Sequence, residues 1–164
     1  MTAANNKDKS MSSPEDTIVL TTTKGDVTIA MRPDLAPNHV ARIKELVREG
    51  FYDGIVFHRV IDGFMAQTGC PQGTGTGGSG KKLKAEFNKE KHVRGTVSMA
   101  RAANPDSGDI QFFICFEDAP FLNGQYTVWG AVTKGMENVD KIKRGEPVVD
   151  PDRILKARMA ADAK

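Results

Sequence analysis

The stretch VFHRVIDGFMAQTG, residues 56–69, places one arginine and one glutamine among aromatic and sulfur-containing side chains. Two apolar runs flank Asp62 and Gly63, a pair that favours a tight turn, so the stretch predicts a β-hairpin. A half-buried guanidinium needs a polar partner, and a purely structural strand pair rarely carries one. We therefore interpret Arg59 and Gln67 as ligand-binding residues, and we expect the partner of Arg59 to be a substrate amide.

The rest of the chain predicts further strands and two helices around this hairpin. Pro37 suits the first turn of a helix, and Gly50 can end one in the left-handed conformation. Apolar residues recur between them at helical spacing, so this helix has one face to bury. From period-two alternation and β-branched runs, we expect strands at 17–22, 27–31, 96–100, 111–116, 127–132 and 154–159, and a short helix at 136–142.

Strands separated by short turns rather than by helices argue for antiparallel pairing. About eight such strands can close into a barrel that leaves no open edge, and the two helices can cover its ends. The predicted fold class is therefore mainly β, a closed eight-stranded antiparallel β-barrel capped by two α-helices. Residues 1–14 are polar and lack periodicity, which predicts a disordered tail before one domain at 15–164.

Composition excludes several classes of protein. The 164 residues are 39% hydrophobic and 27% charged, which fits a globular domain, and the longest apolar runs are far short of a membrane span. The formal net charge is +2 and the basic residues are interleaved with acids, so nucleic acid is not an expected partner. The N-terminus lacks the apolar core of a secretory signal, and Cys70 and Cys115 are solitary, so we expect a reducing cytoplasm.

Other site chemistries find little support. The loop at 75–80 matches a glycine-rich dinucleotide pattern, but Lys82 stands where a P-loop needs a hydroxyl and no helical pattern follows. His39, His58 and His92 have no metal-ligand spacing, so no metal or other cofactor is expected. His58 is expected to be buried and hydrogen-bonded. No nucleophile motif accompanies the serines or cysteines.

Phe112 and Phe113 are adjacent on a predicted strand, so their side chains point to opposite faces. They cannot both fill one core, and one of them is expected to line an external pocket. Gln111 shares the face of Phe113.

Five motifs together resemble the cyclophilin family of peptidyl-prolyl isomerases. They are FHRVIDGFMAQTG (57–69), GTGTGG (73–78), GTVSMA (95–100), QFFI (111–114) and FLNGQYTVWG (121–130). The resemblance runs in order from about residue 17 to about residue 159, and the compact form is similar to bacterial members. It implies the same capped eight-stranded barrel and an Xaa-Pro peptide lying across the outer face.

The resemblance also implies the roles of individual residues, with no cofactor required. Arg59 would be the catalytic arginine. The proline pocket would consist of Phe64, Met65, Phe113 and Leu122. The groove that binds the peptide would be lined by Gln67, Ala100, Arg101, Ala102, Gln111, Phe121 and Tyr126.

Three of these positions depart from the best-known eukaryotic members of the family. Arg101 stands where Asn is common, Tyr126 replaces His, and Phe121 replaces Trp and so lacks an indole N–H donor. We expect catalysis to be retained and cyclosporin to bind weakly. The expected partners are proline-containing peptides and protein clients, and the expected state is a monomer. The alternatives are a proline-peptide binding module without useful catalysis, which the presence of Arg59 and Gln67 disfavours, and a nucleotide-binding protein, which rests only on the glycine loop.

Overall fold

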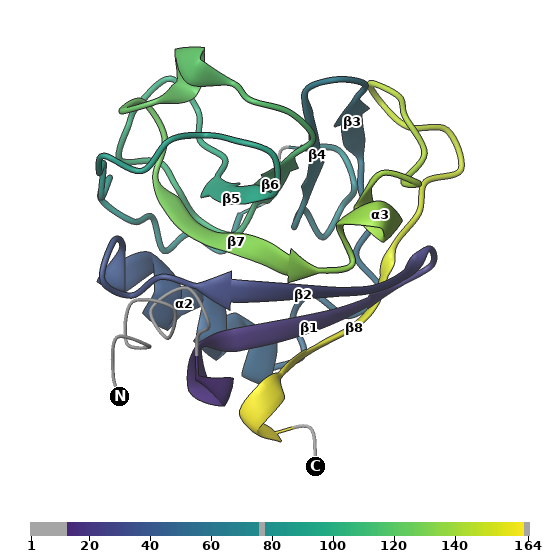
Figure 1. The fold of residues 1–164 in the computed structure, drawn as a ribbon, viewed down its shortest axis with the longest axis horizontal. Helices are drawn as coiled ribbons and strands as arrows, with labels where there is room; N and C mark the ends of the chain where they lie inside the picture. Colours follow the sequence, from purple (N-terminus) through teal and green to yellow (C-terminus); the bar gives the residue numbers. More distant parts are fainter. Residues whose placement is uncertain (1–12, 76–77, 163–164) are drawn as a thin grey trace.

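A computed structural model describes residues 13–75 and 78–162, and eight strands in this part of the chain form one antiparallel sheet (Figure 1). The spatial order of the strands is β3-β4-β6-β5-β7-β2-β1-β8. Their bounds are β1 Thr17–Thr22, β2 Gly25–Met31, β3 Arg59–Ile61, β4 Met65–Thr68, β5 Thr96–Met99, β6 Phe112–Cys115, β7 Val128–Lys134 and β8 Ile154–Met159. The helices are α2 Pro37–Arg48 and α3 Met136–Val139, with 3-10 turns at Pro14–Asp16, Pro120–Leu122 and Ala160–Asp162. The predicted strands, hairpin and two helices are confirmed, whereas residues 1–12 of the predicted tail lie outside the described residues.

The predicted closed barrel is wrong, because the sheet is an open half-barrel with β3 and β8 at its edges. Isolated bridges, at Val60 with Gly145 and at Val56 with Arg153, and scattered backbone hydrogen bonds join the two edge regions in place of a continuous ladder. The segment that would complete the closure contains Pro147 and Pro151, which have no N–H to donate to a continuous ladder. The edges are therefore covered by irregular chain rather than paired strand against strand.

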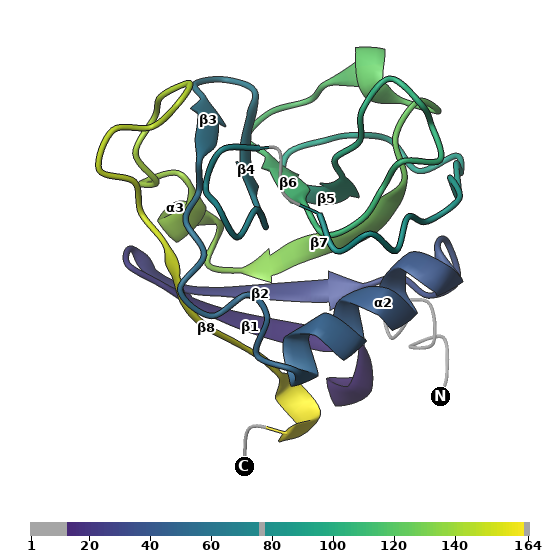
Figure 2. The same ribbon diagram turned by 180° about the vertical axis from the view of Figure 1, so that it is seen from behind.

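Helix α2 lies against the sheet in Figure 2 and buries the apolar face that its sequence predicts. The buried positions Val40, Ile43, Leu46 and Val47 join the main core of the molecule. Gly50 follows the helix with φ 75°, and the N–H of Phe51 donates to the carbonyl of Leu46 at 3.0 Å, which satisfies the last turn.

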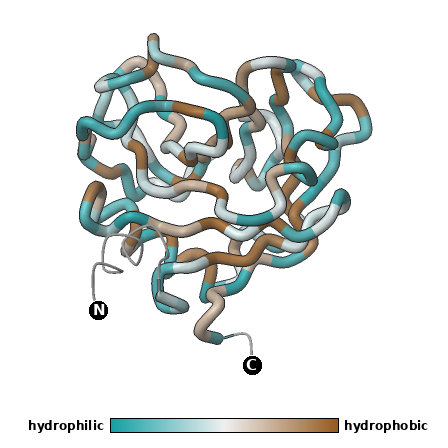
Figure 3. The backbone as a smooth tube through the Cα atoms, in the orientation of Figure 1, coloured by the Kyte–Doolittle hydropathy of each residue, from teal (hydrophilic) through white to brown (hydrophobic). Residues whose placement is uncertain are grey.

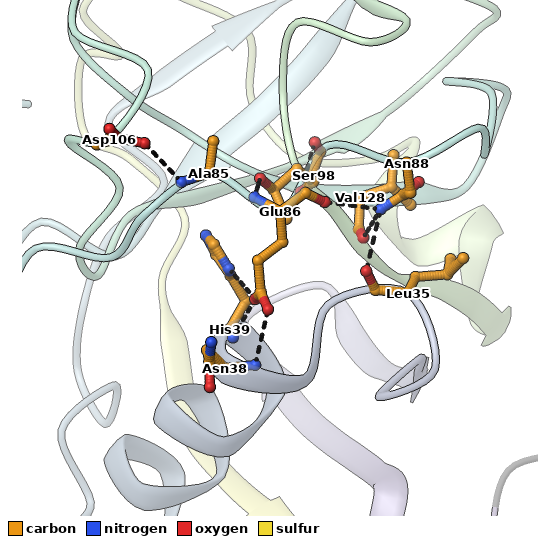
Figure 4. Close-up of polar contacts among 10 residues, drawn as sticks. Leu35, Asn38, His39, Ala85, Glu86, Asn88, Ser98, Asp106 and Val128 are labelled. Atoms are coloured by element: carbon orange, nitrogen blue, oxygen red, sulfur yellow. Dashed lines mark hydrogen bonds and ion pairs between the residues drawn. The ribbon is translucent and has the colours of Figure 1, made fainter.

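The first turn of α2 is capped by a residue far away in the sequence (Figure 4). Its N-cap residue, Ala36, has only a methyl side chain. The carboxylate of Glu86 accepts hydrogen bonds from the backbone N–H groups of Asn38 and His39, at 3.2 and 2.8 Å, and contacts Nδ1 of His39 at 2.6 Å. Burial raises the pKa of Glu86, but these donors outweigh burial and hold the pKa below its ordinary value. Glu86 thus supplies both the acceptor and the negative charge that a helix N-terminus favours.

The sheet separates two apolar clusters, one on each face. On β6, Phe112 and Ile114 belong to the main core, whereas Phe113 and Cys115 belong to a smaller cluster on the other face. This alternation confirms the prediction that the adjacent phenylalanines point in opposite directions. We call the smaller set, Met65, Phe113, Cys115, Ala119 and Leu122, the outer cluster. In Figure 3, hydrophobic segments recur along the strands and alternate with mainly hydrophilic loops.

No helix within the described residues is both long and apolar enough to cross a bilayer.

Candidate active site

A cavity of about 430 Å³ opens beside the outer cluster, on the face of the sheet away from the main core. Nine of the predicted site residues line it: Arg59, Phe64, Met65, Gln67, Ala100, Arg101, Phe113, Leu122 and Tyr126. They come from the β3–β4 hairpin, from β6 and from the loops that follow β5 and Ala119. The fold therefore brings together residues that are spread over almost 70 positions of the sequence.

The floor of this pocket is apolar and its central ring is held firmly. Phe113 is buried and meets Tyr126 edge to face, with 5.7 Å between ring centroids. It also stacks with the ring of His92, with 6.1 Å between centroids, and His92 in turn meets Tyr126 edge to face at 6.4 Å. His92 is itself fixed, since Nε2 lies 2.9 Å from Oγ of Ser98 and Nδ1 lies 3.1 Å from Oδ1 of Asn123. An apolar ring of a ligand would therefore meet a preorganised surface.

Arg59 lines the pocket, and its guanidinium has two protein partners that the sequence analysis did not predict. Its Nε donates to Oε2 of Glu146 at 2.8 Å, and its Nη1 donates to Oε1 of Gln67 at 3.2 Å. Gln67 is its direct cross-strand neighbour on β4. A guanidinium has five N–H donors, so three remain, two of them on Nη2.

The hydrogen bonds continue from Arg59 across the groove. Nε2 of Gln67 donates to Oε1 of Gln111 at 3.0 Å, and Nε2 of Gln111 donates to the carbonyl of Gly75 at 3.0 Å. This chain of amides ties the hairpin to the segment before β6 and to the glycine-rich loop. It therefore fixes the side-chain orientation of both glutamines.

His58 lies next to Arg59 and lines the same pocket. Its predicted burial is confirmed. The prediction that it is hydrogen-bonded is wrong, because neither ring nitrogen has a partner within the described residues. Burial lowers the pKa of His58, and the charge of Arg59 lowers it further. The ring is therefore neutral at pH 7.

A second cavity of about 260 Å³ adjoins the first, sharing Gln67, Gly75, Ala100 and Arg101 with it. Ala102 and Gln111, the next two predicted site residues, line this second cavity. Arg101 is held at the boundary, since its Nε donates to the carbonyl of Gln125 at 2.8 Å and its guanidinium lies 4.7 Å from the ring of Tyr126.

Phe121, the remaining predicted site residue, lines neither of these two cavities. Its side chain is 69% exposed on the Pro120–Leu122 turn, and its ring lies 5.5 Å from that of Phe64. It therefore borders the pocket instead of forming its wall.

Five other lining residues, besides His58, were not among the predicted site residues. Gly73, Thr74 and Gly75 come from the glycine-rich loop, which the sequence analysis weighed as a nucleotide site and used as one motif of the family resemblance, without naming its residues as site residues. Glu146 and Pro147 come from the segment between α3 and β8 and carry no local signal of a site.

Cys115 lies in the outer cluster but does not line the pocket, and its surroundings disfavour the thiolate that a nucleophile needs. Burial raises the pKa of its thiol to about 12, and the charge of Asp118 adds to the effect.

Comparison with known proteins gives one consistent result. The family model described as "Cyclophilin type peptidyl-prolyl cis-trans isomerase/CLD" matches residues 17–159. The probable peptidyl-prolyl cis-trans isomerase of Brucella suis is 55% identical over 172 residues, which cover 94% of this chain and 88% of that protein. The peptidyl-prolyl cis-trans isomerase B of Bacillus subtilis is 48% identical over 122 residues, or 73% of this chain and 85% of that protein.

Solved structures agree with the sequence relatives. A cyclophilin from Hirschia baltica superposes with a TM-score of 0.86 at 31% identity, covering 93% of this chain and 76% of that one. A cyclophilin-type isomerase from Cryptosporidium parvum, crystallised in the presence of the dipeptide Ala-Pro, gives a TM-score of 0.81 at 28% identity, covering 87% of this chain and 98% of that one.

Proposed function

The chain belongs to the cyclophilin-type peptidyl-prolyl cis-trans isomerase family, and from that membership we propose how its pocket accelerates rotation about Xaa-Pro peptide bonds. The proposal assigns the prolyl ring to the apolar floor and the reacting amide to Arg59. The observation that carries it is the geometry of one pocket, in which a buried aromatic floor lies beside a guanidinium that keeps three N–H donors free of the protein partners described above.

The barrier to this rotation is the loss of amide resonance, about 18–20 kcal/mol. No covalent bond breaks, so the reaction requires neither a nucleophile nor a leaving group. Once the bond is twisted, the prolyl nitrogen becomes pyramidal and can accept a hydrogen bond that neither planar isomer can accept. A donor aimed at that nitrogen, or at the adjacent carbonyl, therefore stabilises the transition state more than the ground states.

Arg59 is the proposed donor, and magnitudes show that it does not act alone. Each tenfold acceleration requires about 1.4 kcal/mol of transition-state stabilisation. One charge-assisted hydrogen bond contributes roughly 1.5–3 kcal/mol net, or one to two decades. The remaining acceleration is assigned to the apolar floor, where Phe64, Met65, Phe113 and Leu122 hold the ring and exclude water.

The peptide backbone is proposed to lie along the groove between the two cavities. Gln67, Ala100 and Gln111 face this path, and the carbonyl of Gln111 already accepts the N–H of Ala100 at 3.0 Å. Arg101 lines both cavities, Tyr126 lines the first and Ala102 the second, and Phe121 lies at the rim. The Ala-Pro dipeptide present with the Cryptosporidium parvum structure supports a ligand of this class.

Wider roles are also proposals. We propose that residues 15–164 act as one monomeric domain in the cytoplasm and assist the folding of proline-containing client proteins. Nucleic acid is not proposed as a partner, since the charges are mixed and the formal net charge is only +2. Cyclosporin is proposed to bind weakly, because Phe121 offers no N–H donor.

The catalytic assignment is tested by prolyl exchange on a short Xaa-Pro peptide. Replacing Arg59→Ala should lower kcat/KM roughly 10–100-fold, since it removes one charge-assisted hydrogen bond in the transition state. Arg59→Lys should recover little, because the planar fork is lost. Arg153→Ala, an exposed arginine outside the pocket, is the matched control and should retain full activity. Full activity in Arg59→Ala would overturn the assignment.

A further inference from the structure

Glu146 is the one carboxylate among the described residues that line the pocket, and it contacts Arg59 directly. The distance from Oε2 of Glu146 to Nε of Arg59 is 2.8 Å. The two residues lie 87 positions apart in the sequence, on the edge strand β3 and on the irregular segment before β8.

The backbone holds Glu146 in this place. Val60 and Gly145 exchange two hydrogen bonds, with the N–H of Gly145 donating at 2.7 Å and the N–H of Val60 at 2.8 Å. Arg59 precedes Val60 and Glu146 follows Gly145. Because the two segments run antiparallel, both residues lie on the same side of this bridge. A Cβ on Gly145 would lie only 2.7 Å from Cα of Val148, so the path of the chain into Glu146 depends on this glycine.

The guanidinium of Arg59 is therefore held between two acceptors, one on β4 and one on the irregular segment before β8. Glu146 accepts from Nε on the outer edge of β3, and Gln67 accepts from Nη1 on β4. Two contacts at different nitrogens fix both the direction and the plane of the fork. The N–H groups of Nη2 are left over, and both belong to a residue that lines the pocket.

The ion pair between Arg59 and Glu146 is expected to contribute little to the stability of the fold. The side chains of Arg59 and Glu146 are 40% and 56% exposed, and ion pairs this exposed contribute little to folding because water screens them. We expect the contact to act on the orientation of Arg59 instead, because it restricts a long side chain that has many rotamers.

We propose that Glu146 is a positioning residue for the isomerase reaction, which holds the guanidinium of Arg59 in the plane that presents Nη2 to the twisting amide. The inference rests on the proposed catalytic role of Arg59. Glu146 acts through Arg59 and need not touch the peptide, so its loss should affect kcat more than KM.

Two variants separate orientation from charge. Glu146→Ala removes the acceptor and should lower kcat roughly 3–10-fold while KM stays within about twofold. Glu146→Gln keeps an acceptor oxygen without the charge and should recover most of the lost kcat. Glu137→Ala, which removes an exposed glutamate of α3 outside the pocket, is the matched control and should behave as the unmodified protein.

Two further measurements exclude a merely structural role. In the Arg59→Ala background, Glu146→Ala should produce no additional loss, since the effect passes through Arg59. The NMR signal of Arg59 Nε–H should show slow solvent exchange in the unmodified protein and fast exchange in Glu146→Ala, with an unchanged Tm.

The outcomes distinguish this inference from the proposed function. If Arg59→Ala keeps full activity, the catalytic role of Arg59 fails. If Arg59→Ala is impaired while Glu146→Ala has unchanged or higher kcat, only the positioning role fails. An equal further loss in the double variant would also overturn the positioning role, because Glu146 would then act independently of Arg59.

Discussion

The orientation of Arg59 depends on a residue from a distant part of the chain. The residue type and its apolar surroundings were sufficient to predict it as a site residue, and the structure places it in the wall of the cavity beside the outer cluster. Its orientation was not predictable, because Glu146 approaches from the other end of the chain and no spacing relates the two. His58 shows the converse: its burial follows from its place before β3, but whether its ring nitrogens find partners depends on loops that no periodicity describes.

Phe121 is the residue at which the response to cyclosporin can be tested. Its ring is exposed at the rim of the pocket and has no polar hydrogen to donate. Phe121→Trp adds an indole N–H, and one new neutral hydrogen bond should strengthen inhibition by cyclosporin roughly 2–10-fold. The measurement is the inhibition constant in the prolyl exchange assay, with catalysis unchanged in the absence of cyclosporin. Equal inhibition of both proteins would contradict this expectation.

At the scale of elements, local pattern predicted most of the secondary structure. The apolar face of α2 and the alternation of Phe112 and Phe113 on β6 both follow from side-chain direction alone. What local pattern could not predict is how an element is completed by a remote side chain. Glu86 reaches α2 from a loop 48 residues beyond Asn38.

The cap of α2 therefore predicts a stability effect at a residue outside the helix. Glu86→Ala leaves the first N–H groups of α2 without their carboxylate and should lower the free energy of unfolding by about 1–2 kcal/mol. The measurement is urea denaturation followed by circular dichroism. Glu49→Ala, which alters an exposed glutamate at the other end of α2, should change it by less than about 0.5 kcal/mol. Equal stability of both variants would show that Glu86 is not a cap.

At the scale of the molecule, the sequence led to the right strands and the wrong closure. Strand count and turn spacing indicate an antiparallel sheet, but whether its last edges pair depends on a few residues in one connection. Here Pro147 and Pro151 interrupt the segment that would pair with β3, so two isolated bridges replace a ladder. The same irregular segment delivers Glu146 to the pocket.

Buried histidines make the stability of the whole fold depend on pH. Burial lowers the pKa of His39, His58 and His92 in the folded protein, below the ordinary value of about 6.5. These histidines therefore bind protons more tightly in the unfolded chain than in the folded protein. The free energy of unfolding is unaffected by them above about pH 6.5, and it decreases as the pH falls from there toward their folded pKa values.

Urea midpoints measured at pH 7.5, 6.5 and 5.5 and constant ionic strength should therefore fall in that order. His58→Gln removes one of the titrating groups and should reduce the pH dependence. A midpoint that stays constant or rises toward pH 5.5 would contradict this prediction.

The two clusters on opposite faces of the sheet bear on how such a protein can diversify. Along β6, Phe113 and Cys115 join the outer cluster, whereas Phe112 and Ile114 join the main core. If the proposed peptide site is correct, substitutions on the outer face can change peptide preference while the core residues that maintain the fold are kept. A mutant library restricted to positions 64, 65, 113 and 122 should therefore contain variants with altered peptide preference. The fraction of its members that fold should be far higher than in a library that also varies positions 112 and 114.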